Sequence, residues 1–193
     1  MFPLFTRRLV LRRFAAHDLT AFHAYRNEPG PARFQSWEAI GLTDAAEFIK
    51  EHQIRKAGVP GQWLQIAVAL RETETLIGDC AFKVHADDIR HATIGGTLAR
   101  KYHRQGYGFE GMTCLLHCLF ENLNLHRVVA DTDPENKASW VLMERLGLRR
   151  EGHLKKSLWF KGRWADEYLY AILRDEWQGD ASPTKRPILK LDR

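Results

Sequence analysis

The stretch "IGGTLARKYHRQGYGFEG", residues 94–111, decides how this chain folds. It starts like a strand, its glycines at 106 and 108 predict a turn, and an apolar helical stripe follows over 109–123. Such a turn exposes backbone N–H groups that, with the helix dipole, favour a phosphate. A plain tight turn explains the glycines equally well. No Gly-Lys-Ser/Thr follows, as a P-loop requires, and the preceding strands look antiparallel, which argues against a dinucleotide fingerprint.

Outward from this stretch, hydrophobic periodicity predicts a mixed α/β fold. Helices are expected over 19–27, 45–58, 109–123 and 136–147. Strands are expected over 6–14, 63–70, 75–84, 92–99 and 126–132, and a closing hairpin over 148–173 that turns near "KGR". The short links between residues 63 and 99 suit antiparallel pairing. We expect one domain over residues 1–177 and a C-terminal tail over 178–193.

The composition is that of a globular protein: of 193 residues, 45% are hydrophobic and 27% charged. No run approaches the ~18 apolar residues of a membrane span. The start, "MFPLFTRRLVLRRF", carries arginines and no cleavage site, so we expect a cytoplasmic protein without membrane attachment. Three cysteines argue against a disulfide framework, and the nine histidines are scattered, so no metal site is expected. The net charge of +5 fits an anionic ligand or a solvated basic surface.

Three blocks resemble the GNAT superfamily of acetyl-CoA-dependent N-acetyltransferases: the opening stretch, "LHRVVADTDPENKASWVLMERLGLRREGHL" and "KGRWADEYLYAIL". Within the superfamily the likeness is to the RimJ/RimL-like group, whose best-known members acetylate the N-termini of ribosomal proteins. The resemblance spans about residues 6–177. It implies a single GNAT-type domain with a mixed, largely antiparallel central sheet, flanked by helices and splayed into a V at the acetyl-CoA site.

The family's diphosphate signature, Gln/Arg-x-x-Gly-x-Gly/Ala, falls on residues 103–108. His103 departs from the usual first residue, so its side chain is left to reach either a phosphate or the strand. The resemblance implies that coenzyme A is held at its diphosphate by His103, Arg104, Gln105, Gly106, Tyr107, Gly108 and Phe109. It implies that the pantetheine arm contacts Thr97, Leu98, Ala99, Asn136 and Ser139, although Asn136 also suits the N-cap of a helix. The N–H of Leu98 would be the oxyanion donor.

Acetyl transfer needs a neutral amine, a polarised carbonyl and a proton for the departing thiolate. Many superfamily members take that proton from a Tyr seven residues after the Asn, where this chain has Met143. Ser139 matches a serine placed near the sulfur in this group, so we expect it to donate, although a serine at a helix start also bonds locally. Asp79 is the candidate general base. The alternatives are a water chain or the carboxylates of Glu151, Asp166 and Glu167.

The segment "ARFQSW", residues 32–37, lies in the region that lines the acceptor site in this family. We expect Phe34, Gln35 and Trp37 to wall that site, although Trp37 suits a packed core equally well. The expected reaction is direct attack, in a ternary complex, of a primary amine on acetyl-CoA. The amine is a protein N-terminus or a small molecule. The strand edges and aromatic residues of the closing hairpin also suggest a homodimer.

Two other functions stay open on the sequence alone. A catalytically inactive acyl-CoA-binding sensor would share the scaffold and bind acetyl-CoA without turnover. A ribosome- or nucleic-acid-binding module would fit the basic charge. Its aromatic residues are not interleaved with a basic run, so we do not expect a nucleic-acid partner.

Overall fold

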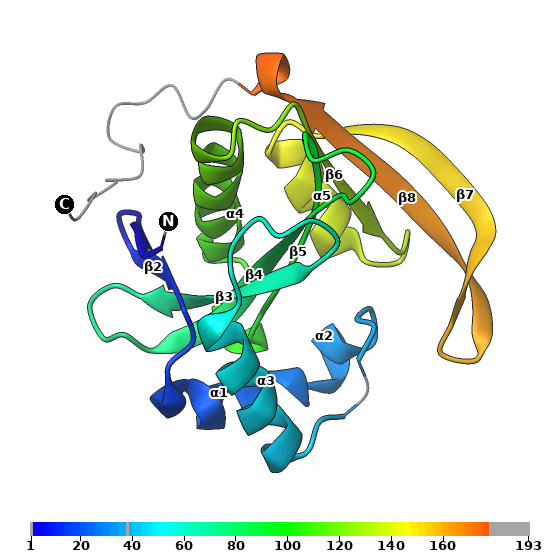
Figure 1. The fold of residues 1–193 in the computed structure, drawn as a ribbon. Helices are drawn as coiled ribbons and strands as arrows, with labels where there is room; N and C mark the ends of the chain where they lie inside the picture. The colour runs from blue at the N-terminus through cyan, green and yellow to red at the C-terminus, as the bar shows by residue number, and fades with distance from the viewer. Residues whose placement is uncertain (1, 38, 178–193) are drawn as a thin grey trace.

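The computed structural model describes residues 2–37 and 39–177. The strands are β1 (Leu4–Phe5), β2 (Leu9–Arg12), β3 (Trp63–Leu70), β4 (Leu76–Val84), β5 (His91–Leu98), β6 (Arg127–Thr132), β7 (Arg149–Phe160) and β8 (Arg163–Leu173). The helices are α1 (Leu19–Arg26), α2 (Pro29–Ala32), α3 (Leu42–Ile54), α4 (Tyr107–His117) and α5 (Lys137–Arg145), and a π-helical segment, Cys118–Asn122, continues α4. Figure 1 shows their arrangement around one sheet.

The strands form a single eight-stranded sheet in the order β1-β2-β3-β4-β5-β6-β8-β7. Every neighbouring pair is antiparallel except β5 and β6. That parallel pair holds together only from His91–Arg127 to Thr93–Val129, and beyond it the two strands have no register partners in common. The sheet therefore opens into a V along the second half of β5.

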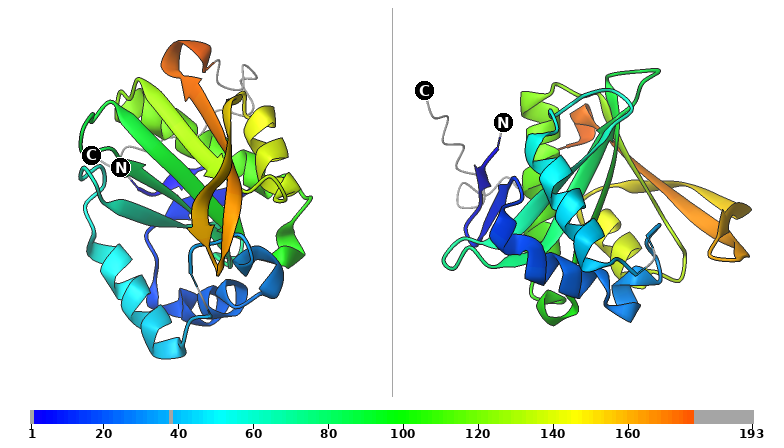
Figure 2. Two further views of the ribbon diagram at one scale, coloured as in Figure 1. Left: turned by 90° about the vertical axis from the view of Figure 1, so that its right-hand side faces the viewer. Right: turned by 60° about the horizontal axis from the view of Figure 1, so that its bottom comes forward.

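Helices cover both faces of the sheet. On one face Leu115 and Phe120, from α4 and its continuation, are fully buried in a cluster that includes Phe82 of β4. On the other face Phe22 of α1 and Ile49 of α3 pack in a second buried cluster. Figure 2 shows α3 lying across the strands. Residues that alternate along each strand thus face α4 and α5 in one set and α1 and α3 in the other.

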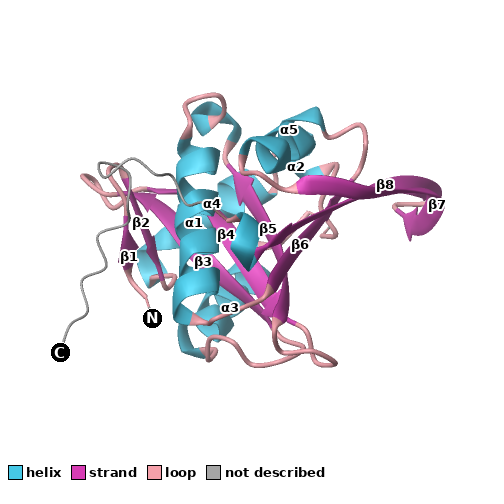
Figure 3. Ribbon diagram, turned by 90° about the horizontal axis from the view of Figure 1, so that it is seen from above, coloured by secondary structure: helices cyan, strands magenta, loops and turns pink. Residues whose placement is uncertain are grey.

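The β7–β8 hairpin extends beyond both helical layers (Figures 1 and 3). Its turn places Lys161 at φ 48° and Gly162 at φ 78°, both in the left-handed region. At this tip the Lys161 ammonium donates to the carbonyl oxygens of Ala32 (2.8 Å) and Trp37 (3.0 Å). The end of the hairpin is therefore anchored to the segment between α1 and α3.

The fold confirms the predicted architecture, including the largely antiparallel sheet and the V-shaped opening. The strand predicted over 6–14 is confirmed only for Leu9–Arg12: Thr6 turns the chain, with its N–H donating to the carbonyl of Leu9, so that this strand pairs with a second short strand, β1. After the helix predicted over 19–27 the structure adds the one-turn helix α2, for which no element was predicted. The expected tail, 178–193, lies outside the described residues.

Candidate active site

The two parallel strands bring two helix N-termini to one edge of the sheet. Because β5 and β6 run in the same direction, their carboxyl ends, Leu98 and Thr132, lie at the same edge. Helix α4 follows β5 and helix α5 follows β6, so both helices begin there. Ligands of open α/β sheets bind outside the carboxyl ends of strands where neighbouring connections diverge. The V between β5 and β6 is such a place.

The backbone of β5 presents alternate N–H groups to the V. Its odd-numbered residues hydrogen-bond toward β4. At one end of the pair the N–H of His85, just after β4, donates to the carbonyl of His91 (2.9 Å), and at the other end the N–H of Ala99 donates to the carbonyl of Ile77 (2.9 Å). The even-numbered residues therefore point away from β4, toward β6. Of the three residues predicted to pair with pantetheine, only Leu98 presents its N–H to the V, while the N–H of Ala99 donates to the carbonyl of Ile77.

The side chain of His103 binds the carbonyl oxygen of Leu98. Its Nε2 lies 2.8 Å from the carbonyl oxygen of Leu98. A carbonyl oxygen can only accept, so Nε2 carries the proton and donates. The sequence left two partners open for the His103 side chain, a phosphate or the strand, and in the structure it binds strand β5.

The loop after β5 leaves a run of backbone donors unused. Within the described residues, none of the six N–H groups from Arg104 to Phe109 donates to a protein acceptor, and the first helical bond is from Glu110 to the carbonyl of Gly106 (3.0 Å). Arg104 at φ 59° and Gly106 at φ 83° both lie in the left-handed region. Alternation of left- and right-handed residues turns successive N–H groups toward one side, which creates an anion-binding concavity.

An ion pair that the sequence did not reveal holds this loop in place. Glu110 accepts hydrogen bonds from the Thr6 hydroxyl (2.6 Å) and from the N–H (2.8 Å) and Nε (2.7 Å) of Arg8. Arg8 also donates to the carbonyl of Gln105 (2.9 Å) and lies over the Tyr107 ring at 4.3 Å. Burial raises the pKa of Glu110, but these hydrogen bonds outweigh it and leave the pKa lowered. No spacing in the sequence connects residues 6–8 with 105–110.

Asn136 and Ser139 lie at the start of α5. Asn136 is the N-cap, with its Oδ1 accepting from the Ser139 N–H at 3.3 Å. The Ser139 side chain is half-buried, and its hydroxyl has no partner among the described residues. The local reading of Asn136 as a cap is therefore correct, while its amide nitrogen and the Ser139 hydroxyl remain available to a ligand.

Asp79 lies in the sheet beneath α1 and is only 3% exposed. Nη2 of Arg26 is 3.0 Å from Oδ2 of Asp79, and the Tyr25 hydroxyl donates to the same oxygen. Burial, followed by the charge on Asp79, raises the pKa of Tyr25, so this hydroxyl remains protonated and can donate. An occupied, buried carboxylate favours a positioning role over proton transfer, and the general-base role of Asp79 stays a prediction.

Phe34, Gln35 and Trp37 are half-buried on the segment between α1 and α3. The Trp37 ring lies on the guanidinium of Arg26, 3.6 Å from centroid to Cζ, and its Nε1 donates to the Arg26 carbonyl (3.3 Å). Neighbouring Arg33 pairs with Glu135, just after β6. This segment therefore approaches the carboxyl ends of β5 and β6 from the α1–α3 face.

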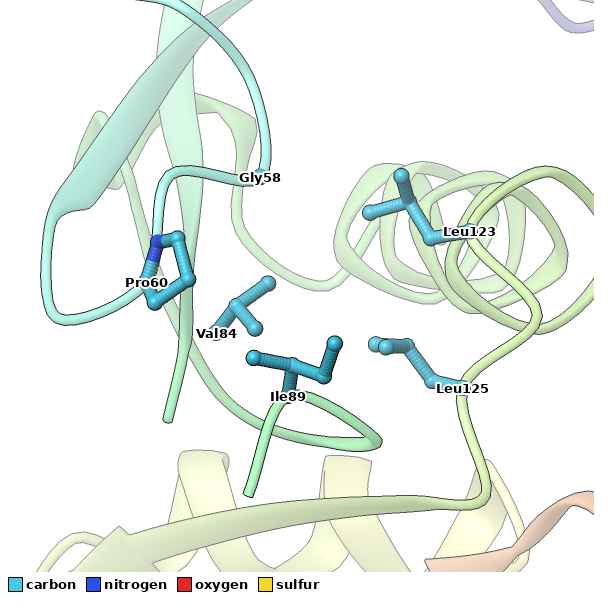
Figure 4. Close-up of a pocket in the computed structure, with 6 residues that line it drawn as sticks. All are labelled: Gly58, Pro60, Val84, Ile89, Leu123 and Leu125. Atoms are coloured by element: carbon cyan, nitrogen blue, oxygen red, sulfur yellow. The ribbon is translucent and has the colours of Figure 1, made fainter. Parts of the chain in front are cut away.

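A separate hollow lies at the opposite edge of the sheet, where β4 ends and β6 is about to begin. Its lining is Gly58, Pro60, Val84, Ile89, Leu123 and Leu125 (Figure 4). It contains no charged or titratable side chain, so it offers no chemistry for the reaction.

Within residues 2–37 and 39–177, no three His, Cys, Asp or Glu side chains group as a metal site would require. In the same residues, no helix combines the length and apolar character that crossing a membrane needs.

Comparison with known proteins gives a consistent picture. Residues 8–149 match the family model described as "Acetyltransferase (GNAT) domain". The chain is 31% identical over 172 residues to the "Uncharacterized N-acetyltransferase YnaD" of Bacillus subtilis (strain 168), which covers 89% of this chain and 97% of that protein. It is 32% identical over 84 residues to the ribosomal protein uS5-alanine N-acetyltransferase of Escherichia coli (strain K12), covering 44% and 43%. The crystal structure of an acetyltransferase (GNAT family) from Bacillus anthracis superposes with a TM-score of 0.79 at 29% identity, covering 90% of this chain and 99% of that one.

Proposed function

This chain belongs to the GNAT acetyltransferase family, whose members use acetyl-CoA, and we propose that it transfers the acetyl group to a primary amine by direct attack in a ternary complex. The observation that carries the proposal is the run of unused backbone N–H groups from Arg104 to Phe109 beside the V between β5 and β6. Those donors suit a diphosphate, which is the anionic part of coenzyme A.

The fit of the coenzyme rests on two further features. A Cβ atom built on Gly108 would lie 3.5 Å from side-chain atoms of both Leu98 and Leu142, so a larger side chain there would fill the space between β5 and α5. The pantetheine arm would follow this space past Asn136, whose amide nitrogen is free to donate. The N–H of Leu98 would then meet the thioester carbonyl and stabilise the negative charge that develops on its oxygen.

Ser139 is proposed to deliver the proton that the departing thiolate needs. A thiol has a pKa of about 8.5, so the thiolate leaves readily and a hydroxyl placed near the sulfur needs only to relay a proton to it. The free hydroxyl of Ser139, on the first turn of α5 and thus at the edge where β5 ends, supports this role. The carboxylate of Asp79 is proposed to hold Arg26, and through it Trp37, next to the strand that carries Leu98.

The acceptor amine is proposed to enter from the face of α1 and α3, between the segment with Phe34, Gln35 and Trp37 and the tip of the β7–β8 hairpin. The bonds from Lys161 to Ala32 and Trp37 keep these two walls together. The acceptor classes are a protein N-terminus and a small-molecule amine. The Escherichia coli relative is named for acetylating an alanine of a ribosomal protein, which favours including N-terminal peptides in the first test.

A thiol-release assay tests the proposal directly. Acetyl-CoA is mixed with the protein and, in separate reactions, with spermidine, an alanine-initiated peptide and a serine-initiated peptide. We expect coenzyme A release that depends on one of these amines, with the acetylated amine detected by mass spectrometry. Acetyl-CoA binding without release across a broad amine panel would instead identify a sensor. Absence of binding, with salt-sensitive affinity for RNA, would favour the nucleic-acid module.

A further inference from the structure

A second carboxylate lies on the acceptor side of the V, and the reaction proposed above does not yet use it. Asp131 is on β6, two residues beyond Val129, the last residue of that strand to pair with β5. If the pairing continued in register, Asp131 would lie opposite Gly95. The neighbours of Asp131, Ala130 and Thr132, are buried on the α4–α5 side, so the Asp131 side chain emerges on the α1–α3 face.

The same face has open space on the other side of the V. A Cβ atom built on Gly95 would have no atom within 4 Å, although the backbone there does not need glycine for a positive φ. Two residues along β5, the Thr97 hydroxyl is more than nine-tenths buried and has no hydrogen-bond partner among the described residues. Thr97 and Gly95 project to the same side of the sheet as Asp131. The site thus combines a gap, an unsatisfied hydroxyl and a carboxylate.

Asp131 has the environment of a proton acceptor. Its side chain is exposed to solvent, and within the described residues no other residue forms a hydrogen bond or ion pair with its carboxylate. Surrounding protein nevertheless raises its pKa by burial, and the negative charge of Glu167 on β8 adds to the rise, while Lys83 on β4 opposes it. A carboxylate with a raised pKa is a better base near neutral pH.

The other carboxylates near this edge already have a hydrogen-bond or ion-pair partner on another residue, whereas Asp131 has none among the described residues. Glu167 accepts from the Ser157 hydroxyl at 2.8 Å. The remaining pairs are Asp79 with Arg26, Asp133 with Arg163, Glu135 with Arg33, Asp166 with His153, and Glu28 with the N–H of Arg100.

We propose that Asp131 is the general base of the reaction and that the acceptor amine sits over Gly95, between Asp131 and Thr97. The inference rests on the proposed acetyl transfer. The acceptor ammonium gives one proton to the Asp131 carboxylate, and the amine nitrogen then forms a bond to the thioester carbon as the carbonyl electrons move to oxygen. When the carbonyl re-forms, the carbon–sulfur bond breaks. The second proton of the nitrogen reaches the sulfur by way of Ser139, and Asp131 returns its proton to solvent.

The test is the pH dependence of turnover in Asp131→Asn, measured from pH 6 to 10 with acetyl-CoA and whichever of the three panel amines the wild type acetylates. We expect kcat to fall about 100-fold at pH 7, as loss of a general base does, with KM for acetyl-CoA unchanged. The loss should shrink as the pH passes the pKa of the amine, about 8 for an α-amino group, because the free amine then forms without help. Asp88→Asn, a matched change at the far β4–β5 turn, should leave the profile unchanged.

Glu167→Gln supplies an independent readout. Removing its negative charge should move the lower inflection of the pH profile to lower pH, because the ionised form of Asp131 becomes easier to reach. Wild-type kcat and an unchanged pH profile in a folded Asp131→Asn variant would overturn the inference alone. Absence of thiol release by the wild type with every panel amine would overturn the proposed function and this inference together.

Discussion

His103 donates from Nε2 to the carbonyl oxygen of Leu98 across 2.8 Å, and this bond ties the loop after β5 back to the end of that strand. The carbonyl of Leu98 is thereby occupied, while its N–H points into the V. The carbonyl of Leu98 therefore holds the loop that carries the free donors, and the N–H of the same residue faces the space where a thioester would lie. The loop with the free amides and the end of β5 are therefore held together.

The space beside Gly108 should control coenzyme binding. Gly108→Trp should weaken acetyl-CoA binding at least 10-fold, because its side chain would occupy the gap between Leu98 and Leu142. Gly108→Ala should bind nearly normally, since its Cβ makes ordinary contacts at 3.5 Å and alanine favours the helix. Isothermal titration calorimetry measures both affinities, and thermal unfolding confirms that both variants fold. Equal affinities for the two variants would show that the coenzyme lies elsewhere.

Ser139→Ala should affect turnover more than binding. The N-cap bond uses the backbone N–H of Ser139, so the substitution leaves the cap of α5 intact. Loss of a proton donor costs about 10²-fold or more in kcat, with KM for acetyl-CoA nearly constant. Steady-state kinetics at pH 7 gives both constants. A variant with wild-type kcat would remove Ser139 from the mechanism.

Removing one partner of the buried Arg26–Asp79 pair should lower the free energy of unfolding, whereas replacing both residues with apolar ones should largely preserve it. Asp79→Leu alone leaves the Arg26 guanidinium buried without a partner and should lower the free energy of unfolding by about 3–5 kcal/mol. Adding Arg26→Met should recover most of that loss. Urea unfolding of the single and double variants measures the difference. A double variant no more stable than the single one would show that the loss does not come from an unpaired Arg26 guanidinium.

His52 should make stability depend on pH between its unfolded and folded pKa values. It is 3% exposed, and burial, followed by the charge of Arg55, lowers its pKa from 6.5 to about 4. The unfolded chain therefore binds a proton first as the pH falls below 6.5, and stability declines toward pH 4 by up to about 3 kcal/mol. His52→Gln should flatten this slope in urea unfolding at pH 7, 6 and 5. Identical slopes for variant and wild type would assign the loss to other groups.

The sequence was most informative where local pattern and family motif coincide. Periodicity located α4, α5 and the closing hairpin, and the Gly106 and Gly108 motif marked the loop whose N–H groups prove to be free. It was least informative about pairings between distant residues. Glu110 with Arg8, and Asp79 with Arg26, join segments about a hundred and about fifty residues apart, and only the folded chain brings them together.

The proposed general base, Asp131, shows why part of a candidate site can escape a reading of the sequence. In "HRVVADT" it is one charged residue in a short strand, and Val128, Ala130 and Thr132 account for the buried face. The only signal was a carboxylate in a short strand whose central residues, Val128, Val129 and Ala130, are apolar. Its relevance depends on where β5 and β6 part, which is set by the three-dimensional register and not by local composition.

A crystal structure of the chain with coenzyme A would show whether the free amides after β5 bind the diphosphate of acetyl-CoA. We expect diphosphate oxygens about 3 Å from backbone nitrogens between Arg104 and Phe109, with the pantetheine arm running into the V past Leu98. A diphosphate bound at another surface, or a V between β5 and β6 closed by the protein's own side chains, would contradict it.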